Sequence, residues 1–88
     1  IEARLVSMSK HHGAWTMWEM HPNGAEVVLC TAGTLSLTQK LPEGEVTTVL
    51  QAGQCIVNPP GGWHTANEDT AGTAVFITAD VGTEHRPR

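Results

Sequence analysis

Apolar and polar residues alternate in short stretches along the whole chain. The alternation is clearest over residues 34–38, Thr-Leu-Ser-Leu-Thr, and the segment 45–50 is similarly rich in valine and threonine. A period of two residues is typical of a β-strand with one buried face. Glycine, proline and asparagine stand between these stretches at short intervals, which leaves no room for helices of ordinary length. The pattern therefore predicts a protein made of strands and turns.

We expect about eight strands, because one strand and its turn take roughly 8–12 residues in an all-β sandwich or barrel. The expected strands cover residues 3–9, 14–21, 25–31, 34–40, 45–50, 54–58, 63–68 and 73–79. Residues 10–13 and 70–72 are expected to form turns. Residues 80–88 contain Gly82, Pro87 and several charges, so we expect a surface tail rather than a further strand.

The chain has 88 residues, of which 40% are hydrophobic and 16% charged, and no segment has the composition of a linker. These values indicate one small globular domain over residues 1–88. A domain of this size buries only about 60–65% of the surface that its unfolded chain exposes. A bound metal ion, a partner subunit or both would therefore add to a small margin of stability.

Charge and cysteine content narrow the class of protein. Nine acidic and five scattered basic residues give a net charge of −4, which argues against nucleic-acid binding. The longest apolar runs are far below the roughly 18 residues of a membrane span, so we expect a soluble protein. No leader of basic and then apolar residues opens the chain, and Cys30 and Cys55 form no Cys-x-x-Cys motif. Free thiols in the cytoplasm are the expectation, with a disulfide between the two cysteines as the alternative.

Four side chains that can bind metal stand out by their placement: Glu19, His21, Glu26 and His64. Glu19 and His21 are two positions apart in one expected strand, so both point to the same face. Glu26 follows a Pro-Asn-Gly turn, and a tight connection there brings its carboxylate back beside His21. His64 follows the Pro-Pro-Gly-Gly corner at 59–62, which can turn the next strand across a barrel. Two imidazoles and one or two carboxylates suit Mn, Fe, Ni or Zn, with positions left for water or substrate.

The spacing of these residues resembles the two sequence motifs of the cupins, a family of small β-barrels. The first motif, G-x5-H-x-H-x3–4-E-x6-G, is matched by Gly13, Glu19, His21, Glu26 and Gly33, with a glutamate in place of the first histidine. The second motif, G-x5-P-x-G-x2-H-x3-N, is matched by Gly53, Pro59, Gly61 and His64, with Asn67 one residue early. The motifs at 13–33 and 53–67 imply a single-domain cupin, a jelly-roll barrel of the double-stranded β-helix type.

The family usually has its first metal-binding histidine where this chain has Glu19. A carboxylate at that place can be a fourth ligand, which would favour Mn, Fe or Zn over softer ions. It can also act as a free base beside an open metal position, or mark a cupin that has lost its metal. An ordinary exposed strand carboxylate is a further alternative.

Alternation along the strands also predicts a pocket and an outer surface. If Glu19 and Glu26 point into the barrel, a mainly apolar substrate pocket forms around them, with ordinary core packing as an equal alternative. The expected pocket residues are Trp15, Met17, Val28 and Cys30. Trp18 and Met20 then point outward, and their apolar area favours coverage by a second subunit and so a homodimer.

The resemblance implies a class of function rather than one reaction. It is compatible with a metal-dependent enzyme of dioxygenase, lyase or isomerase type that acts on a small organic molecule, and its catalytic residues beyond the metal set are unassigned. The alternative is a non-catalytic metabolite-binding or sensor protein whose metal is structural or absent. The chain has no tyrosine, which excludes tyrosine-based lyase chemistry, and no G-x-S-x-G motif for a serine nucleophile. A sugar isomerase or epimerase would need further bases, whereas His11, His12 and His85 are expected at the solvated surface.

Overall fold

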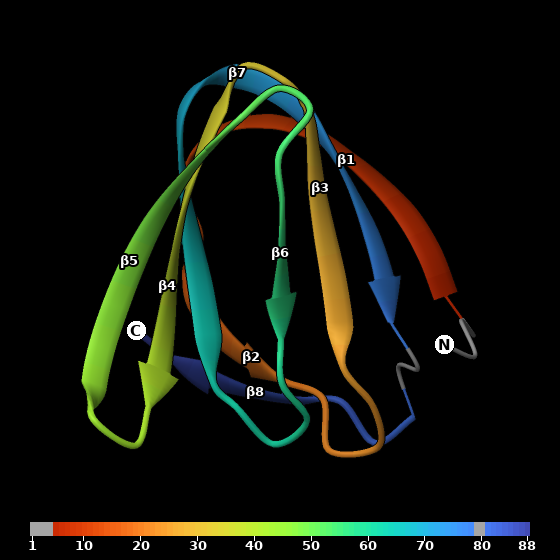
Figure 1. Ribbon diagram of the computed structural model, residues 1–88, viewed down its shortest axis with the longest axis vertical. Helices are drawn as coiled ribbons and strands as arrows, with labels where there is room; N and C mark the ends of the chain where they lie inside the picture. The colour runs from red at the N-terminus through yellow and green to blue at the C-terminus, as the bar shows by residue number, and fades with distance from the viewer. Residues whose placement is uncertain (1–4, 79–80) are drawn as a thin grey trace.

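The described residues form eight antiparallel strands that wrap around a common interior (Figure 1). The computed structural model describes residues 5–78 and 81–88, and it describes side chains for residues 15–67, 72–78 and 81–88. In chain order the strands are β1 (Leu5–Ala14), β2 (Met17–Met20), β3 (Glu26–Ala32), β4 (Thr34–Leu41), β5 (Gly44–Gln51), β6 (Cys55–Asn58), β7 (His64–Thr78) and β8 (Glu84–Pro87). The described residues contain no helix long and apolar enough to cross a membrane.

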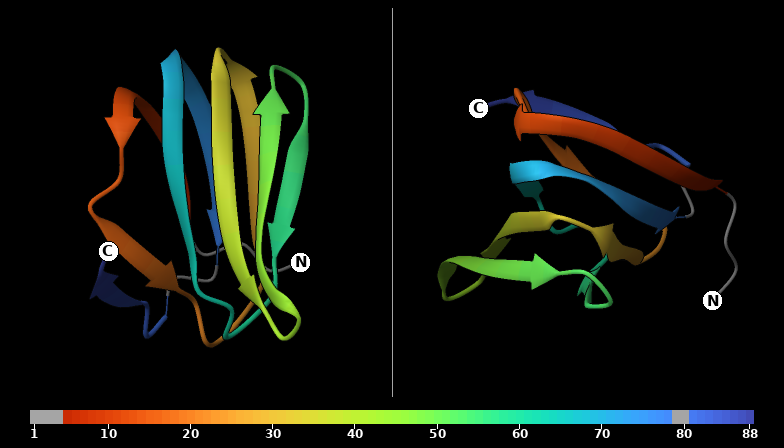
Figure 2. Two further views of the ribbon diagram at one scale, coloured as in Figure 1. Left: turned by 90° about the vertical axis from the view of Figure 1, so that its left-hand side faces the viewer. Right: turned by 90° about the horizontal axis from the view of Figure 1, so that it is seen from above.

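Strand β7 passes through both layers of the barrel (Figure 2). Its residues 64–67 pair with β4 on one side and meet β2 and the end of β1 on the other. Its residues 73–77 lie between β1 and β3. Strands β5, β8 and β6 extend these sheets outward from β4, β2 and β3. The architecture is an all-β jelly-roll barrel, as the resemblance implied.

The hydrophobic core fills the interior between the two layers. Its buried members are Val28, Cys30, Leu35, Leu37, Leu50, Ala66, Ala74 and Phe76. Burial alternates residue by residue along β3 and β4, so the apolar positions of these strands face inward and drive their packing. Trp15 packs against the core, with its ring centroid 5.8 Å from that of Phe76. Of the four expected pocket residues, Val28 and Cys30 are therefore core residues.

Two expected turns are wrong, because the chain continues as strand through both. Residues 70–72 lie inside β7, where a Cβ at Gly72 would overlap the carbonyl oxygen of Ala32. Glycine there allows β7 to pass close to the irregularity of β3 between Cys30 and Ala32 rather than to reverse direction. Residues 10–13 lie inside β1, which shifts register against β7 between His11 and Gly13. The irregular backbone at this place is therefore a β-bulge within a strand, and not the turn that the sequence predicted.

The expectation of a surface tail after residue 80 is also wrong in part. The segment is exposed, but residues 84–87 form β8 and pair with β2. Arg88 holds the end of the strand in place, since its guanidinium donates to the backbone carbonyls of Trp15 and Ala66 and to Asn67 Oδ1. Three polar residues followed by Pro87 show no alternation, so only the free edge of β2 explains the strand.

Cationic side chains of the same chain cover two tryptophans. The ammonium of Lys40 lies 4.4 Å from the ring centroid of Trp18, and the guanidinium of Arg86 lies 4.1 Å from that of Trp63. Contacts of this kind let long basic side chains shield apolar rings while their charges stay in water. The Trp18 ring thus has a cover within its own chain, which removes part of the argument for a second subunit.

Candidate metal centre

A row of polar side chains crosses four neighbouring strands. In the strand register, Gln39 of β4 is opposite His64 of β7, His64 is opposite Glu19 of β2, and Glu19 is opposite His85 of β8. Directly opposite residues place their side chains on the same face of a sheet. The side chain of His64 is 1% exposed, that of Glu19 28% and that of His85 49%, so the row leads from the interior to solvent.

The other two candidate ligands come from the connection between β2 and β3. His21 directly follows β2, and its backbone carbonyl accepts a hydrogen bond from Gly61 N at 3.0 Å. Glu26 is the first residue of β3 and is buried. Ligand atoms of Glu19, His21, Glu26 and His64 all lie within 4.8 Å of one another. The four side chains singled out in the sequence therefore lie together and can hold a metal ion.

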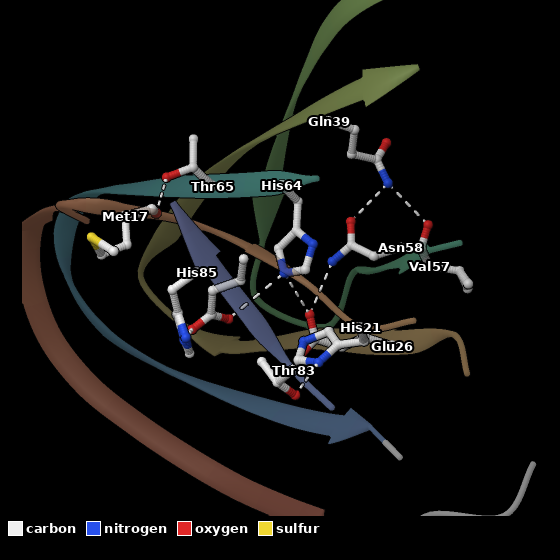
Figure 3. A network of polar contacts seen from close by, with 11 residues as sticks. Met17, His21, Glu26, Gln39, Val57, Asn58, His64, Thr65, Thr83 and His85 are labelled. Atoms are coloured by element: carbon white, nitrogen blue, oxygen red, sulfur yellow. Dashed lines mark hydrogen bonds and ion pairs between the residues drawn. The ribbon is translucent and has the colours of Figure 1, made fainter. Parts of the chain in front are cut away.

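Glu26 is the centre of the cluster (Figure 3). Its Oε2 lies 3.2 Å from His21 Nε2, and its Oε1 lies 3.0 Å from His64 Nε2. Asn58 Nδ2 also donates a hydrogen bond to Oε1 at 3.1 Å. Burial alone would raise the pKa of Glu26, but the contacts with the two imidazoles outweigh it and lower the pKa to about 2. Glu26 is thus ionised at neutral pH, and its carboxylate is in the form that binds a metal ion.

The pKa values of His64 and Glu19 are also shifted by contacts within this cluster. Burial works to lower the pKa of His64, but the contacts with Glu19 and Glu26 outweigh it and raise the pKa to about 9. The pKa of Glu19 is lowered, chiefly by its contact with His64 at 3.8 Å, although burial and the charge of Glu26 oppose the shift. Without a metal, the cluster therefore holds a proton on His64 that a metal ion would have to displace.

The imidazole nitrogens test whether these residues fit a metal ion. The Nε2 atoms of His21 and His64 are buried, yet neither has a hydrogen-bond partner of acceptable geometry despite its short distance to Glu26. Buried nitrogens are costly without such a partner, and a metal ion would take the electron pair of each, in place of the proton that His64 holds in its absence. A Zn-type ion would bind nitrogen and oxygen ligands at about 2.0–2.2 Å, and ligand atoms within 4.8 Å of one another could hold it after small side-chain shifts. The donor set fits a divalent transition ion.

His21 shows a further feature of metal-ligating histidines. Its Nδ1 lies 2.9 Å from Thr83 Oγ1, on the side of the ring away from Glu26. A partner on one ring nitrogen fixes the ring and leaves the other nitrogen for the metal. Thr83 therefore orients Nε2 of His21 toward the cluster.

Four residues around the site were missed in the sequence: Gln39, Asn58, Thr83 and His85. His85 was expected at the solvated surface, but its half-exposed ring places Nε2 3.2 Å from Glu19 Oε2. Asn58 precedes two prolines and has the composition of a turn residue, although it is the buried end of β6 opposite Glu26. Only the strand register, which pairs residues far apart in sequence, would have revealed these contacts.

The shifted pKa values predict how the stability of the metal-free protein changes with pH. The pKa of His64 rises from 6.5 to about 9 on folding, so this contribution is complete below pH 6.5 and is lost as the pH rises through 9. The pKa of Glu26 falls from 4.5 to about 2, so its contribution is complete above pH 4.5 and is lost as the pH falls toward 2. We expect the free energy of unfolding to decrease between pH 6.5 and 9, by at most about 1.4 kcal/mol per pH unit for one proton.

Urea unfolding in the presence of a chelator, at several pH values across this range, measures the decrease. His64→Gln is the control, because an amide cannot take up the proton and the slope should flatten. A stability that stays constant or rises over the range would contradict the assignment of the proton to His64.

Comparisons with known proteins agree with the fold. The family model Cupin_2, described as the cupin domain, matches residues 5–80. No curated protein matches the sequence. A cupin-2 domain containing protein from Shewanella frigidimarina NCIMB 400 is 25% identical, with a TM-score of 0.65, over 94% of this chain and 69% of that chain.

Two enzymes share the fold at lower identity. Hydroquinone 1,2-dioxygenase PnpCD, in complex with Cd2+ and 4-hydroxybenzonitrile, is 16% identical with a TM-score of 0.73. A mutant of the 3,4-ketoisomerase QdtA from Thermoanaerobacterium thermosaccharolyticum, in complex with TDP-4-keto-6-deoxyglucose, is 15% identical with a TM-score of 0.70. Each match covers 88% of this chain and 58% of the other, so this chain spans little more than half the length of either enzyme.

Proposed function

The chain belongs to the cupin family, and from this premise we propose that it is a metal-dependent enzyme that acts on a small organic molecule at the His/Glu cluster. Its ligands are His21, Glu26 and His64, and Glu19 is a fourth ligand or a base. The metal is Mn, Fe, Zn or Ni, which accept mixed imidazole and carboxylate ligands. The reaction is of dioxygenase, lyase or isomerase type.

The observation that carries this proposal is the position of Glu26 between two buried imidazole nitrogens. Its side chain is 3% exposed, and both nitrogens lack a hydrogen-bond partner. When bound, the metal supplies Lewis-acid polarisation of an oxygen or activation of dioxygen. Glu26 and His64 keep the interior side of the site closed to water, since both are buried.

The exposed side of the cluster is where a substrate would approach. Glu19 and His85 lie on that side, with His85 Nε2 3.2 Å from Glu19 Oε2. The opposite side is filled by the core, so a substrate pocket can use Met17 and Trp15, which are partly buried, but not Val28 or Cys30. A small molecule that offers one or two oxygen atoms to the metal fits this one-sided access.

Anaerobic loading with each of the four metals, followed by elemental analysis, tests the proposal. We expect one metal ion per chain, and consumption of dioxygen or isomerisation by the loaded protein in a screen of phenols, hydroxy acids and keto sugars. Glu26→Gln, treated in the same way, is the matched control and should show neither. Failure to bind any of the four metals would overturn the metal centre.

A non-catalytic metabolite-binding or sensor protein is the second candidate. The composition of the site favours it in one respect: among the described side chains, the titratable groups that contact the cluster are the candidate ligands themselves and His85. An enzyme with so few further acids and bases must rely on the metal and on Glu19. Metal loading that stabilises the protein without turnover on any screened compound would favour the sensor.

We also propose that residues 1–88 form one cupin domain, and that two copies of the chain form a homodimer in the cytoplasm. The two cysteines are free thiols, one buried and one exposed, which is compatible with a reducing compartment. Val49 of β5 and Val57 of β6 are exposed on outer strands of the barrel, and a second copy would cover such apolar area. Sedimentation equilibrium gives the number of subunits directly.

A further inference from the structure

Two buried amide side chains form a chain of hydrogen bonds that ends on Glu26. Gln39 is 8% exposed and Asn58 is 2% exposed, so both amides are removed from water. Gln39 Nε2 donates to Asn58 Oδ1 at 2.9 Å, and Asn58 Nδ2 donates to Glu26 Oε1 at 3.1 Å. Figure 3 shows this chain on the side of Glu26 away from Thr83.

The direction of this chain is fixed at its far end. Gln39 Nε2 also donates to the backbone carbonyl of Val57 at 3.0 Å. A carbonyl oxygen can only accept, so the end of Gln39 that faces β6 must be its NH2 group. Asn58 must then turn its oxygen toward Gln39 and its NH2 group toward Glu26. The amide of Asn58 therefore presents a donor, and never an acceptor, to the carboxylate.

We propose that Asn58, oriented by Gln39, is a positioning residue that holds the Glu26 carboxylate between His21 and His64 in the geometry that binds the metal. The inference rests on the proposed function, because it assigns Asn58 a role toward the metal that Glu26 would bind. Asn58 Nδ2 and His64 Nε2 both approach Oε1, while Oε2 faces His21. One oxygen of the carboxylate is thus held by the Asn58 amide of β6 before a metal arrives, with the His64 nitrogen of β7 3.0 Å from it.

A purely structural role accounts poorly for this arrangement. Two apolar side chains of similar shape at 39 and 58 would fill the same space without the cost of burying two amides, and such replacements are often neutral or stabilising. The amide pair is useful only if its terminal donor is needed at Glu26. Outer partners of metal ligands contribute in this manner, and their loss typically weakens metal binding about 10–100-fold.

Three variants separate positioning from folding. Asn58→Leu removes one of the two acceptors of Gln39 and the amide donor to Glu26, and we expect it to lose both stability and affinity for Co2+. The double variant Gln39→Met/Asn58→Leu removes both amides together, so it should regain stability while its affinity for Co2+ stays about 10–100-fold below that of the parent chain. Leu35→Ala, in the core on β4, is the control that loses stability alone.

Thermal unfolding measures stability, and titration with Co2+ measures both affinity and the visible absorption spectrum of the bound ion. We expect the spectrum of Asn58→Leu and of the double variant to differ from the parent, and that of Leu35→Ala to match it. The inference is overturned if Asn58→Leu binds Co2+ as tightly as the parent, or if the double variant regains affinity together with stability. A parent chain that binds no Co2+ would instead overturn the proposed function, and the positioning role with it.

Discussion

Replacing Glu26 with glutamine is expected to weaken the binding of Co2+ or Zn2+ by more than about 100-fold, beyond the loss typical of an outer partner. The same replacement at Glu19 is expected to cost about tenfold or less. Both changes remove one negative charge and keep the shape of the side chain. They differ in position, since Glu26 is buried at 3.0–3.2 Å from both imidazoles, whereas Glu19 is 28% exposed and lies 3.8 Å from one of them.

Equilibrium dialysis with elemental analysis measures the two affinities, and circular dichroism confirms that each variant keeps its strands. The pair serves as its own control, because the variants differ only in which carboxylate is lost. Equal losses would make Glu19 a full ligand rather than a weaker fourth partner or a base. No loss in either variant would show that the ion pairs of Glu26 serve folding alone.

Much of the strand arrangement could be predicted because burial on one face imposes a period of two. Strand β4 shows this best, since its alternation of threonine or serine with leucine reappears as an alternation of burial. The two predicted turns that are wrong each contain a glycine, at 13 and at 72. A glycine can mark a reversal or a close approach of two backbones, and only the partner strand decides between them. At Gly72 that partner is Ala32.

The candidate ligands could be predicted because three of them are close in sequence, on β2, directly after it and at the start of β3, although these two strands pair with other strands and form no hairpin. Glu19, His21 and Glu26 are placed by local alternation and one turn, and His64 is added by the resemblance of the second motif. The residues that surround them are placed by register between distant strands. Asn58 is 32 positions from the Glu26 that it contacts, and His85 is 66 positions from Glu19. No local pattern encodes such distances.

Strand β8 matters to the site as well as to the fold. It brings His85 to Glu19, and the residue just before the strand, Thr83, to His21. The edge of β2 that it covers would otherwise leave its backbone donors and acceptors open to other strands. The segment expected to be a tail therefore contacts two of the four candidate ligands, which links the order of this segment to the order of the cluster.

Saturating Zn2+ is expected to raise the melting temperature of the protein by about 15–30 °C over the chelated form. A ligand at about 1,000 times its dissociation constant adds about 4 kcal/mol to the free energy of unfolding. In a domain of about 60–100 residues, 1 kcal/mol shifts the melting temperature by about 4–8 °C. The effect should be large here because the ion would bind in a buried cluster in which the Nε2 atoms of both His21 and His64 lack hydrogen-bond partners.

Thermal unfolding followed by circular dichroism, with Zn2+ and with EDTA, measures the shift. Because metal binding must displace the proton of His64, whose pKa is about 9, the shift should increase from pH 6.5 to pH 8 at a fixed excess of Zn2+. Glu26→Gln should show little or no shift at either pH, while Glu19→Gln should keep most of it. A parent chain that melts at one temperature with and without metal, at both pH values, would leave the cluster as a set of buried ion pairs within the barrel.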